Sequence, residues 1–383
     1  MFSNSKINKT VGHCKIKTAM NGIAALTAGL VSNFALAGKA FDDYPADYSA
    51  DLSKAPMYTL TDITDWGKSI MDVYSITTWV LVFVFFAVAI PCVYALYKFR
   101  ATGEETELPK QVTGNHVLEI LWTVIPVGLL LIIAVPTWEV IFEQEQAQRK
   151  AATSSETLKV NVVGHQWWWE FQYPDLGVTT ANELVLPENT PVEFTIKSVD
   201  VIHSFYIPRF GGKIDAVPGK DNKLAYTTPA LVNTKDNNGD IYQGHCLELC
   251  GLSHALMRFE TIVKSKDGFN KFIASHNTAP VVMTEREKRG EQVFAQCMSC
   301  HTISGTPSAD LKIAKLGPDL SNFGSRKYLG SQTRKNTMDN LKAWIKDPAS
   351  IKPGSLMPAL GLSDDQIDDV AAYLQFSTAK DSK

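Results

Sequence analysis

The sequence predicts a multidomain membrane protein that contains a two-helix transmembrane hairpin, an all-β domain and an all-α domain. Three observations lead to this fold class. Two long uncharged runs lie in the first part of the chain, short β-rich runs follow them, and capped amphipathic segments come last. A chain of 383 residues has room for two ordinary domains in addition to the hairpin.

Composition and charge exclude several classes of protein. A hydrophobic content of 45% is too high for a disordered chain and too low for one wholly embedded in a membrane. The net charge of −3 argues against a nucleic-acid partner. Four of the 6 cysteines form two close pairs with histidines nearby, whereas a disulfide framework would scatter them.

Residues 1–37 have the pattern of a secretory signal peptide. A basic start is followed by a small apolar run, and "ALA" at 35–37 suits a cleavage site. An additional anchor helix is the open alternative. Residues 38–70 are then expected to form an N-terminal segment on the periplasmic side.

Residues 71–139 are predicted to form the transmembrane hairpin. The uncharged runs at 73–97 and 120–138 have 25 and 19 residues, enough for a bilayer core of about 30 Å. The signal peptide places both ends outside, so we expect a two-pass protein of a bacterial inner membrane with both large domains in the periplasm. Glu119 lies just inside the second helix, where a carboxylate is costly unless it is used. A glutamate that snorkels to the interface is the alternative reading.

The all-β domain is expected over 140–268 and the all-α domain over 284–379. Runs such as "LKVNVVGHQWWWEFQY" and "MRFETIVKS", punctuated by Pro, Gly and Asn, predict a small antiparallel sandwich or barrel. Further on, "TEREKRGEQVFAQCMSCH" begins with a Thr cap and an acidic first turn, so we expect the final "CMSCH" to lie on a capped helix. Two more capped helices are predicted in "TMDNLKAWIKDPAS" and "SDDQIDDVAAYLQF".

The stretch "GHCLELCGLSHALM" at 244–257 gathers soft metal ligands. Cys246, Cys250, His254 and Met257 lie within it, and His203 lies upstream in "DVIHSFYIP". Thiolates and imidazoles together select copper, zinc or iron–sulfur. A blue-copper site would need one cysteine, and a Cys₂His₂ zinc site would not need the methionine. Two coppers bridged by two thiolates would use the whole set.

One structural alternative for this loop is a Cys246–Cys250 disulfide with His254 and Met257 as packing residues. His245 is expected to lie outside any metal site, because a side chain next to a ligand points away from the metal. His165 is also expected to lie outside it, because a lone extra histidine is usually only a hydrogen-bonding residue.

Several motifs together resemble the second subunit of haem–copper cytochrome c oxidases. They are "LEILWTVIP", "GHQWWWEFQY", "DVIHSFYIPRFGGKIDAVPG" and "CLELCGLSHALM", and they cover roughly residues 70 to 265. The resemblance implies a cupredoxin fold that carries a binuclear CuA centre. Two departures from the family pattern, Phe205 and Trp168, do not touch an expected ligand.

The resemblance also implies roles for individual residues. Cys246 and Cys250 would bridge the coppers, and His203 and His254 would each hold one. Met257 and the backbone carbonyl of Glu248 would be the axial ligands. The Glu248 carboxylate would belong to a magnesium or manganese site shared with subunit I. Trp167 would be the exposed tryptophan through which electrons reach the coppers, and Glu119 would lie near a proton entrance of subunit I. A core or interface aromatic is the alternative reading of Trp167.

"CMSCH" at 297–301 is the pattern of covalent c-type haem attachment. Cys297 and Cys300 would form the thioethers, and His301 would be an axial iron ligand. Met357, in "KPGSLMPAL", would be the other, since a His/Met pair suits an electron donor with a raised potential. A redox or zinc pair is the alternative for the motif alone. Together with "LGPDL" at 316–320, the segment 284–377 resembles class I cytochromes c.

The two resemblances imply subunit II of a terminal oxidase with a fused haem domain. Electrons would pass from one haem c to the copper pair and on to subunit I, where oxygen is reduced and protons are pumped. Subunit III, an external cytochrome c or other donor, and the lipid bilayer are the further expected partners. The rival hypothesis is a stand-alone, membrane-tethered copper and haem electron carrier without an oxidase partner.

Overall fold

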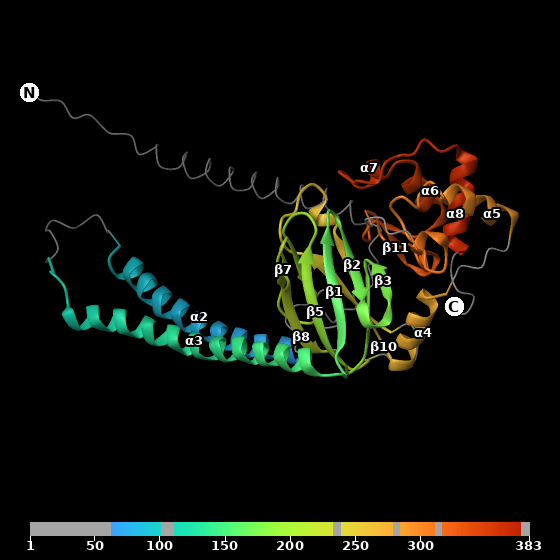
Figure 1. Ribbon diagram of the computed structural model, residues 1–383. Helices are drawn as coiled ribbons and strands as arrows, with labels where there is room; N and C mark the ends of the chain where they lie inside the picture. Colours follow the sequence, from blue (N-terminus) through green and yellow to red (C-terminus); the bar gives the residue numbers. More distant parts are fainter. Residues whose placement is uncertain (1–62, 101–110, 233–238, 279–283, 311–315, 377–383) are drawn as a thin grey trace, which may run out of the picture. The chain divides into compact units, whose positions relative to one another are not determined.

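Figure 1 presents the computed structural model, which describes residues 63–100, 111–232, 239–278, 284–310 and 316–376. The expected signal peptide at 1–37 and most of the segment expected at 38–70 lie outside these residues. The described part contains a helical hairpin, an all-β domain and a mainly helical C-terminal domain. The predicted fold class is therefore confirmed.

Two long helices form the hairpin, α2 (Asp65–Lys98) and α3 (His116–Thr153). Thr64 and Asn115 cap their N-termini by accepting hydrogen bonds from backbone amides. Most of their large apolar side chains are exposed, and both helices are long and apolar enough to cross a membrane. Each helix continues beyond the predicted range 71–139, because polar residues extend it at the end near the β domain.

Those polar helix ends contact the β domain. Ser69 Oγ donates to Glu143 Oε2 at 3.1 Å, which places the start of α2 beside the later part of α3. Gln144 and Gln148 donate side-chain hydrogen bonds to the carbonyl oxygens of Ala225 and Lys223. The hairpin is therefore joined to the β domain by direct hydrogen bonds as well as by the chain.

The β domain consists of two five-stranded sheets with the orders β3-β2-β1-β5-β8 and β4-β10-β9-β6-β7. The strands of the first sheet are β1 (Leu158–His165), β2 (Trp168–Tyr173), β3 (Val178–Ala181), β5 (Pro191–Ser198) and β8 (Asn222–Thr227). Those of the second sheet are β4 (Glu183–Pro187), β6 (His203–Tyr206), β7 (Ile214–Ala216), β9 (Asp240–Cys246) and β10 (Arg258–Lys264). The predicted sandwich is confirmed, although β1–β5 and β4–β10 pair in parallel.

Aromatic side chains from both sheets form the core of the sandwich. The Phe205 and Phe259 rings stack with centroids 5.2 Å apart, and Trp169 meets each of them edge-on at 5.8 Å. Burying one such ring stabilises the fold by about 1.5–3 kcal/mol. Trp169 also contacts the ring of His203, so the core directly supports the start of β6.

The C-terminal domain contains α5 (Glu285–Phe294), α6 (Met338–Lys346), α7 (Pro348–Ile351) and α8 (Asp364–Phe376). Its core is separate from that of the sandwich and includes the Phe294 and Tyr373 rings, 5.5 Å apart. Helix α4 (Lys266–His276) precedes it and packs Phe269 against Tyr173 of the sandwich. The segment after the sandwich is thus partly helical and anchored.

One expectation for this domain is wrong. The "CMSCH" motif does not lie on the capped helix, because α5 ends at Phe294 and Cys297 begins a separate turn closed by the His301 amide. The helical domain also contains a short two-stranded ribbon, β11 (Tyr328–Leu329) and β12 (Arg334–Lys335).

Candidate metal and haem sites

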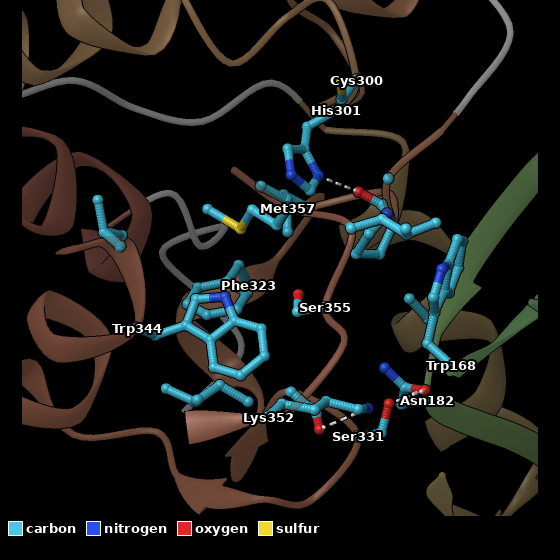
Figure 2. A pocket seen from close by; sticks show the side chains of 18 of the residues that line it. Trp168, Asn182, Cys300, His301, Phe323, Ser331, Trp344, Lys352, Ser355 and Met357 are labelled. Atoms are coloured by element: carbon cyan, nitrogen blue, oxygen red, sulfur yellow. Dashed lines mark hydrogen bonds between the residues drawn. The ribbon is translucent and has the colours of Figure 1, made fainter. Parts of the chain in front are cut away.

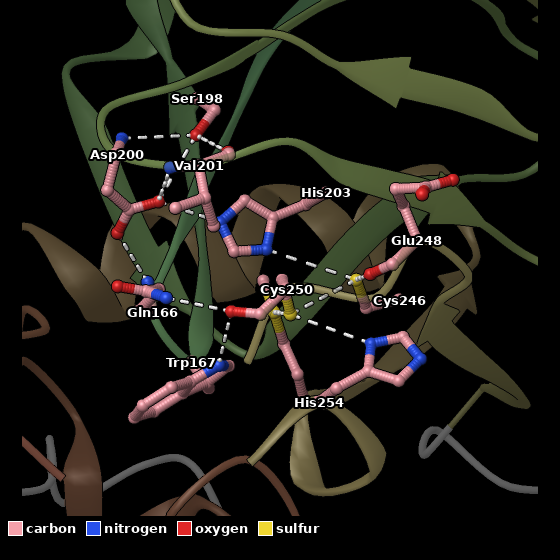
Figure 3. Close-up of polar contacts among 11 residues, drawn as sticks. Gln166, Trp167, Ser198, Asp200, Val201, His203, Cys246, Glu248, Cys250 and His254 are labelled. Carbon is pink, nitrogen blue, oxygen red and sulfur yellow. Dashed lines mark hydrogen bonds and ion pairs between the residues drawn. The ribbon is translucent and has the colours of Figure 1, made fainter. Parts of the chain in front are cut away.

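The soft ligands predicted from sequence converge at one end of the sandwich (Figure 3). Cys246 ends β9, and Cys250 follows in the loop, with the two Sγ atoms 3.8 Å apart. His203 Nδ1 lies 3.9 Å from the Cys246 sulfur, and His254 Nδ1 lies 3.5 Å from the Cys250 sulfur. Each thiol therefore has its own imidazole. Both cysteines are free, so the structure does not have the alternative disulfide.

Two weaker donors complete the cluster on opposite sulfurs. Met257 Sδ lies 3.8 Å from Cys250 Sγ, and the carbonyl oxygen of Glu248 lies 3.3 Å from Cys246 Sγ. Met257 is fully buried. The donor set of two thiols, two imidazoles, a thioether and a carbonyl therefore fits a pair of soft metal ions.

The two thiols interact strongly with one another. The pKa of Cys246 is lowered, first by its hydrogen bond with Cys250 and further by its hydrogen bond with His203. The pKa of Cys250 is raised, first by its hydrogen bond with Cys246 and further by burial. Soft metal ions bind the thiolate form, so binding to both sulfurs would release the thiol protons.

The Asp200 carboxylate contacts the His203 ring on the side away from the sulfur, and this contact was not predicted from the sequence. Asp200 Oδ1 lies 2.8 Å from His203 Nε2, on the side of the ring opposite the sulfur. Burial alone would raise the pKa of Asp200, but hydrogen bonds from His203 and from backbone amides outweigh it and lower this pKa. A carboxylate on the far nitrogen fixes the tautomer and orientation of a metal-binding histidine. The i, i+3 spacing in "DVIH" was the available signal.

A cavity of about 320 Å³ lies next to the "CMSCH" turn (Figure 2). Cys297, Cys300, His301 and Met357 all line it, as expected for a haem site. The remaining wall is largely apolar and includes Leu320, Phe323, Leu341, Trp344 and Leu374. Burial raises the pKa of the Cys297 thiol to about 11. An apolar slot with two thiols and two axial donors fits a covalently attached haem.

His301 is oriented by the "LGPDL" segment. Its Nδ1 lies 2.8 Å from the Pro318 carbonyl oxygen, which leaves Nε2 for a metal. The backbone reaches this close because residue 317 is glycine: a Cβ there would lie 2.6 Å from the imidazole Cε1. Burial lowers the pKa of His301, so the ring is kept neutral, the form that ligates iron.

Comparisons with known proteins agree with both sites. The family described as "Cytochrome C oxidase subunit II, transmembrane domain" matches residues 66–140, and its periplasmic domain matches residues 177–265. The family "Cytochrome c" matches residues 287–377. The cytochrome c oxidase subunit 2 of Bacillus sp. (strain PS3) is 40% identical over 282 residues, which cover 72% of this chain and 78% of that protein. The corresponding protein of Bacillus subtilis (strain 168) is 38% identical over 294 residues, or 74% and 81% of the two chains.

The chain belongs to the cytochrome c oxidase subunit II family. Its match to the periplasmic domain implies copper, its match to cytochrome c implies haem, and subunit I of the oxidase is the implied partner. The transmembrane match makes the hairpin a membrane anchor. A crystal structure of the periplasmic domain of subunit II of the Bradyrhizobium japonicum oxidase is also similar, with 30% identity and a TM-score of 0.28 over 30% of this chain and 91% of that chain.

The expected surroundings of Trp167 in this subunit II are wrong. The family resemblance led us to expect an exposed ring, but Trp167 is only 8% exposed. Its indole Nε1 donates to the carbonyl oxygen of Cys250 at 3.0 Å. On its other side it meets Gly354, in the segment that carries Met357. The C-terminal domain therefore covers the ring.

The remaining predicted residues lie as follows. His165 stacks on Trp168 at 4.1 Å and contacts Glu170, so it lies outside the cluster. His245 precedes Cys246 on β9, and adjacent strand side chains point to opposite faces of the sheet. Glu119 is in the first turn of α3, where its side chain contacts His116 at 3.2 Å and is 45% exposed. Its expected role near a proton entrance of subunit I stays a prediction.

Proposed function

We propose that this subunit carries electrons from its C-terminal haem domain to its copper domain and on to subunit I, where oxygen is reduced with coupled proton pumping. In the bound state, the haem and the copper pair supply reversible one-electron chemistry. The observation that carries the proposal is the pairing of each thiol with one imidazole, Cys246 with His203 and Cys250 with His254.

We assign the protein's contribution residue by residue. Cys246 and Cys250 would bridge two coppers, His203 and His254 would each bind one, and Met257 and the Glu248 carbonyl would be axial. Cys297 and Cys300 would attach the haem, with His301 and Met357 as axial ligands. The buried aromatic core behind His203 keeps these donors fixed, which suits a site whose geometry should change little on reduction.

The wider assignments are part of the same proposal. The hairpin would lie in a bacterial inner membrane with both large domains in the periplasm, and subunit III and an external electron donor would be further partners. The Glu248 carboxylate would join a magnesium or manganese site at the interface with subunit I. Three exposed leucines beside Glu248, at 247, 249 and 252, support a protein partner on this loop.

The test is Cys250→Ser in the full-length chain assembled in an oxidising compartment. The wild-type chain should give haem bands and a copper EPR signal split by two equivalent nuclei. The variant should lose this copper signal and keep the haem bands. Cys92→Ser is the matched control, since Cys92 is exposed on α2, far along the chain from both sites.

Metal analysis decides between this function and its rivals. Zinc, a single copper or a disulfide in the assembled wild-type chain would remove the copper assignment. A pull-down from detergent extract should recover a multi-helix haem protein as subunit I, and its absence would favour the stand-alone carrier.

A further inference from the structure

We propose that Lys352, Ser331 and Gly354 form a contact surface, here called the interdomain seat, that holds the haem domain against Trp167 of the copper domain. This contact prevents an external electron donor from reaching Trp167. The inference rests on the proposed function and deepens it, because it assigns the residues that position one domain against the other. In this arrangement the external donor has to deliver its electron to the haem domain, since the copper domain's own entrance is covered.

The backbone carbonyl of Trp167 is the centre of the seat. It accepts hydrogen bonds from two side chains of the C-terminal domain, Lys352 Nζ at 2.5 Å and Ser331 Oγ at 3.0 Å. The same residue donates its indole N–H to the Cys250 carbonyl. Trp167 therefore connects the haem domain to one of the two proposed bridging ligands.

A lysine is unusual at position 352, because this position is buried between the two domains. Its side chain is buried, with 4% exposure, and it reaches two carbonyl oxygens, those of Trp167 and Gly330. Burial lowers the pKa of this amine to about 7. Burying an amine costs free energy, and an apolar residue could make a purely structural contact here without that cost. The position of Lys352 is therefore best explained by recognition of the copper-domain carbonyl.

The turn of the β11–β12 ribbon supplies the second contact. Gly330, Ser331 and Gln332 all have a positive φ, at 59°, 61° and 62°. For Ser and Gln this left-handed backbone is strained, and it persists only where surrounding contacts hold it. Ser331 is buried and contacts both the Trp167 carbonyl and Asn182 Oδ1. The strained turn therefore packs against the surface of the copper domain.

Gly354 places the third contact, on the indole ring itself. A Cβ at this position would lie 2.6 Å from Trp167 Cη2, closer than real side chains approach. In the preceding residue, the Pro353 carbonyl accepts a hydrogen bond from Ser253, in the copper loop between Cys250 and His254. The segment that carries Met357 is therefore seated directly on the copper loop and its tryptophan.

The experiment uses two variants of the full-length, metal-loaded chain with matched controls. Lys352→Met removes the buried donor, and Lys346→Met removes an exposed lysine of the same domain that pairs with Asp364. Gly354→Ala introduces the clash with Trp167. Gly361→Ala has the same left-handed backbone, φ +66° against +80°, but nothing lies within 4 Å of its added Cβ.

Two readouts are measured for each variant. The first is hydrogen exchange of the backbone amides around Trp167 and the ribbon turn, which is independent of activity. The second is the rate of intramolecular reduction of the copper domain after a light-triggered reduction of the haem domain. In both test variants, exchange should rise and the intramolecular rate should fall by about tenfold or more, because charged and closely fitted contacts are lost. Direct reduction of the copper domain by an added soluble c-type cytochrome should then appear.

The controls should stay within about twofold of the wild type in every measurement. The proposal of an interdomain seat would be wrong if either measurement stayed unchanged in both test variants. This result differs from failure of the proposed function, in which the wild-type chain itself would not load its copper pair and haem.

Discussion

At the scale of single residues, the site depends on groups that bind no metal themselves. Asp200 is the clearest case, because its carboxylate fixes the far nitrogen of His203. We expect Asp200→Asn to weaken copper retention by about tenfold or more, since the carboxylate partner raises the basicity of a metal-binding histidine. Titration with a copper chelator measures the change.

Asp215→Asn provides the comparison for that experiment. Asp215 is exposed and pairs with Lys213 on the surface of the same domain. An equal loss of copper in both variants would mean that the effect comes from net charge rather than from the hydrogen bond to His203.

Glu260 should make stability depend on pH. It is 3% exposed, its Oε2 has no hydrogen-bond partner within the described part of the chain, and its register neighbour on β4 is Glu183. Burial, and secondarily repulsion by Glu183, raises the pKa of Glu260 to about 7. The folded chain therefore holds a proton that the unfolded chain releases above its ordinary pKa of 4.5, and stability falls as pH rises from about 4.5 to 7.

Glu260→Gln removes this cost. Urea unfolding should show the variant more stable than the wild type by about 3 kcal/mol at pH 8 and nearly equal to it at pH 4. Glu156→Gln, at an exposed glutamate, should change neither value. A destabilised Glu260→Gln chain at pH 8 would mean that the carboxylate is charged and well paired.

At the scale of elements, the haem domain begins with a complete capping box on α5. Thr284 Oγ1 accepts from the Glu287 amide at 3.2 Å, and the Glu287 carboxylate accepts from the Thr284 amide at 3.1 Å. We expect Thr284→Ala to lower the free energy of unfolding of this domain by about 1 kcal/mol. Because the two bonds close one motif, Thr284→Ala and Glu287→Ala should not be additive in a double-mutant cycle by chemical denaturation. Full additivity would show that the two bonds act independently.

Elements with local signals were predictable from the sequence, and elements set by distant contacts were not. The cap at Thr284 and the alternating runs of β1 and β10 have their cause within a few residues. The left-handed turn at Ser331 in the β11–β12 ribbon could not be predicted from residue type, because contacts with the copper domain hold its backbone. The burial of Trp167 was missed for the same reason.

The ligand cluster itself was predictable because cysteine, histidine and methionine at this spacing have few other uses together. Its geometry agrees with the two-thiol arrangement. Asp200 was missed because a single carboxylate beside a strand resembles a surface residue until its distance to His203 is known.

At the scale of the whole molecule, the described part of the chain beyond the hairpin has two separate hydrophobic cores that share no residue. Each core should unfold as its own cooperative unit, connected through the contacts at Trp167. The proposed copper ligands all belong to the first unit, so removal of copper should mainly destabilise that unit. A ligand at 100 times its Kd contributes about 2.7 kcal/mol, so the midpoint of the copper-domain transition should fall by several degrees.

Calorimetry of the full-length chain, with copper and after chelation, measures this directly. The haem-domain transition should move by much less, and the residual shift reports the coupling through the seat. Cys250→Ser is the control, since added copper should then shift neither transition. If chelation lowers both transitions equally, the two cores unfold together, and the haem domain depends on the copper domain for its stability as well as for its position.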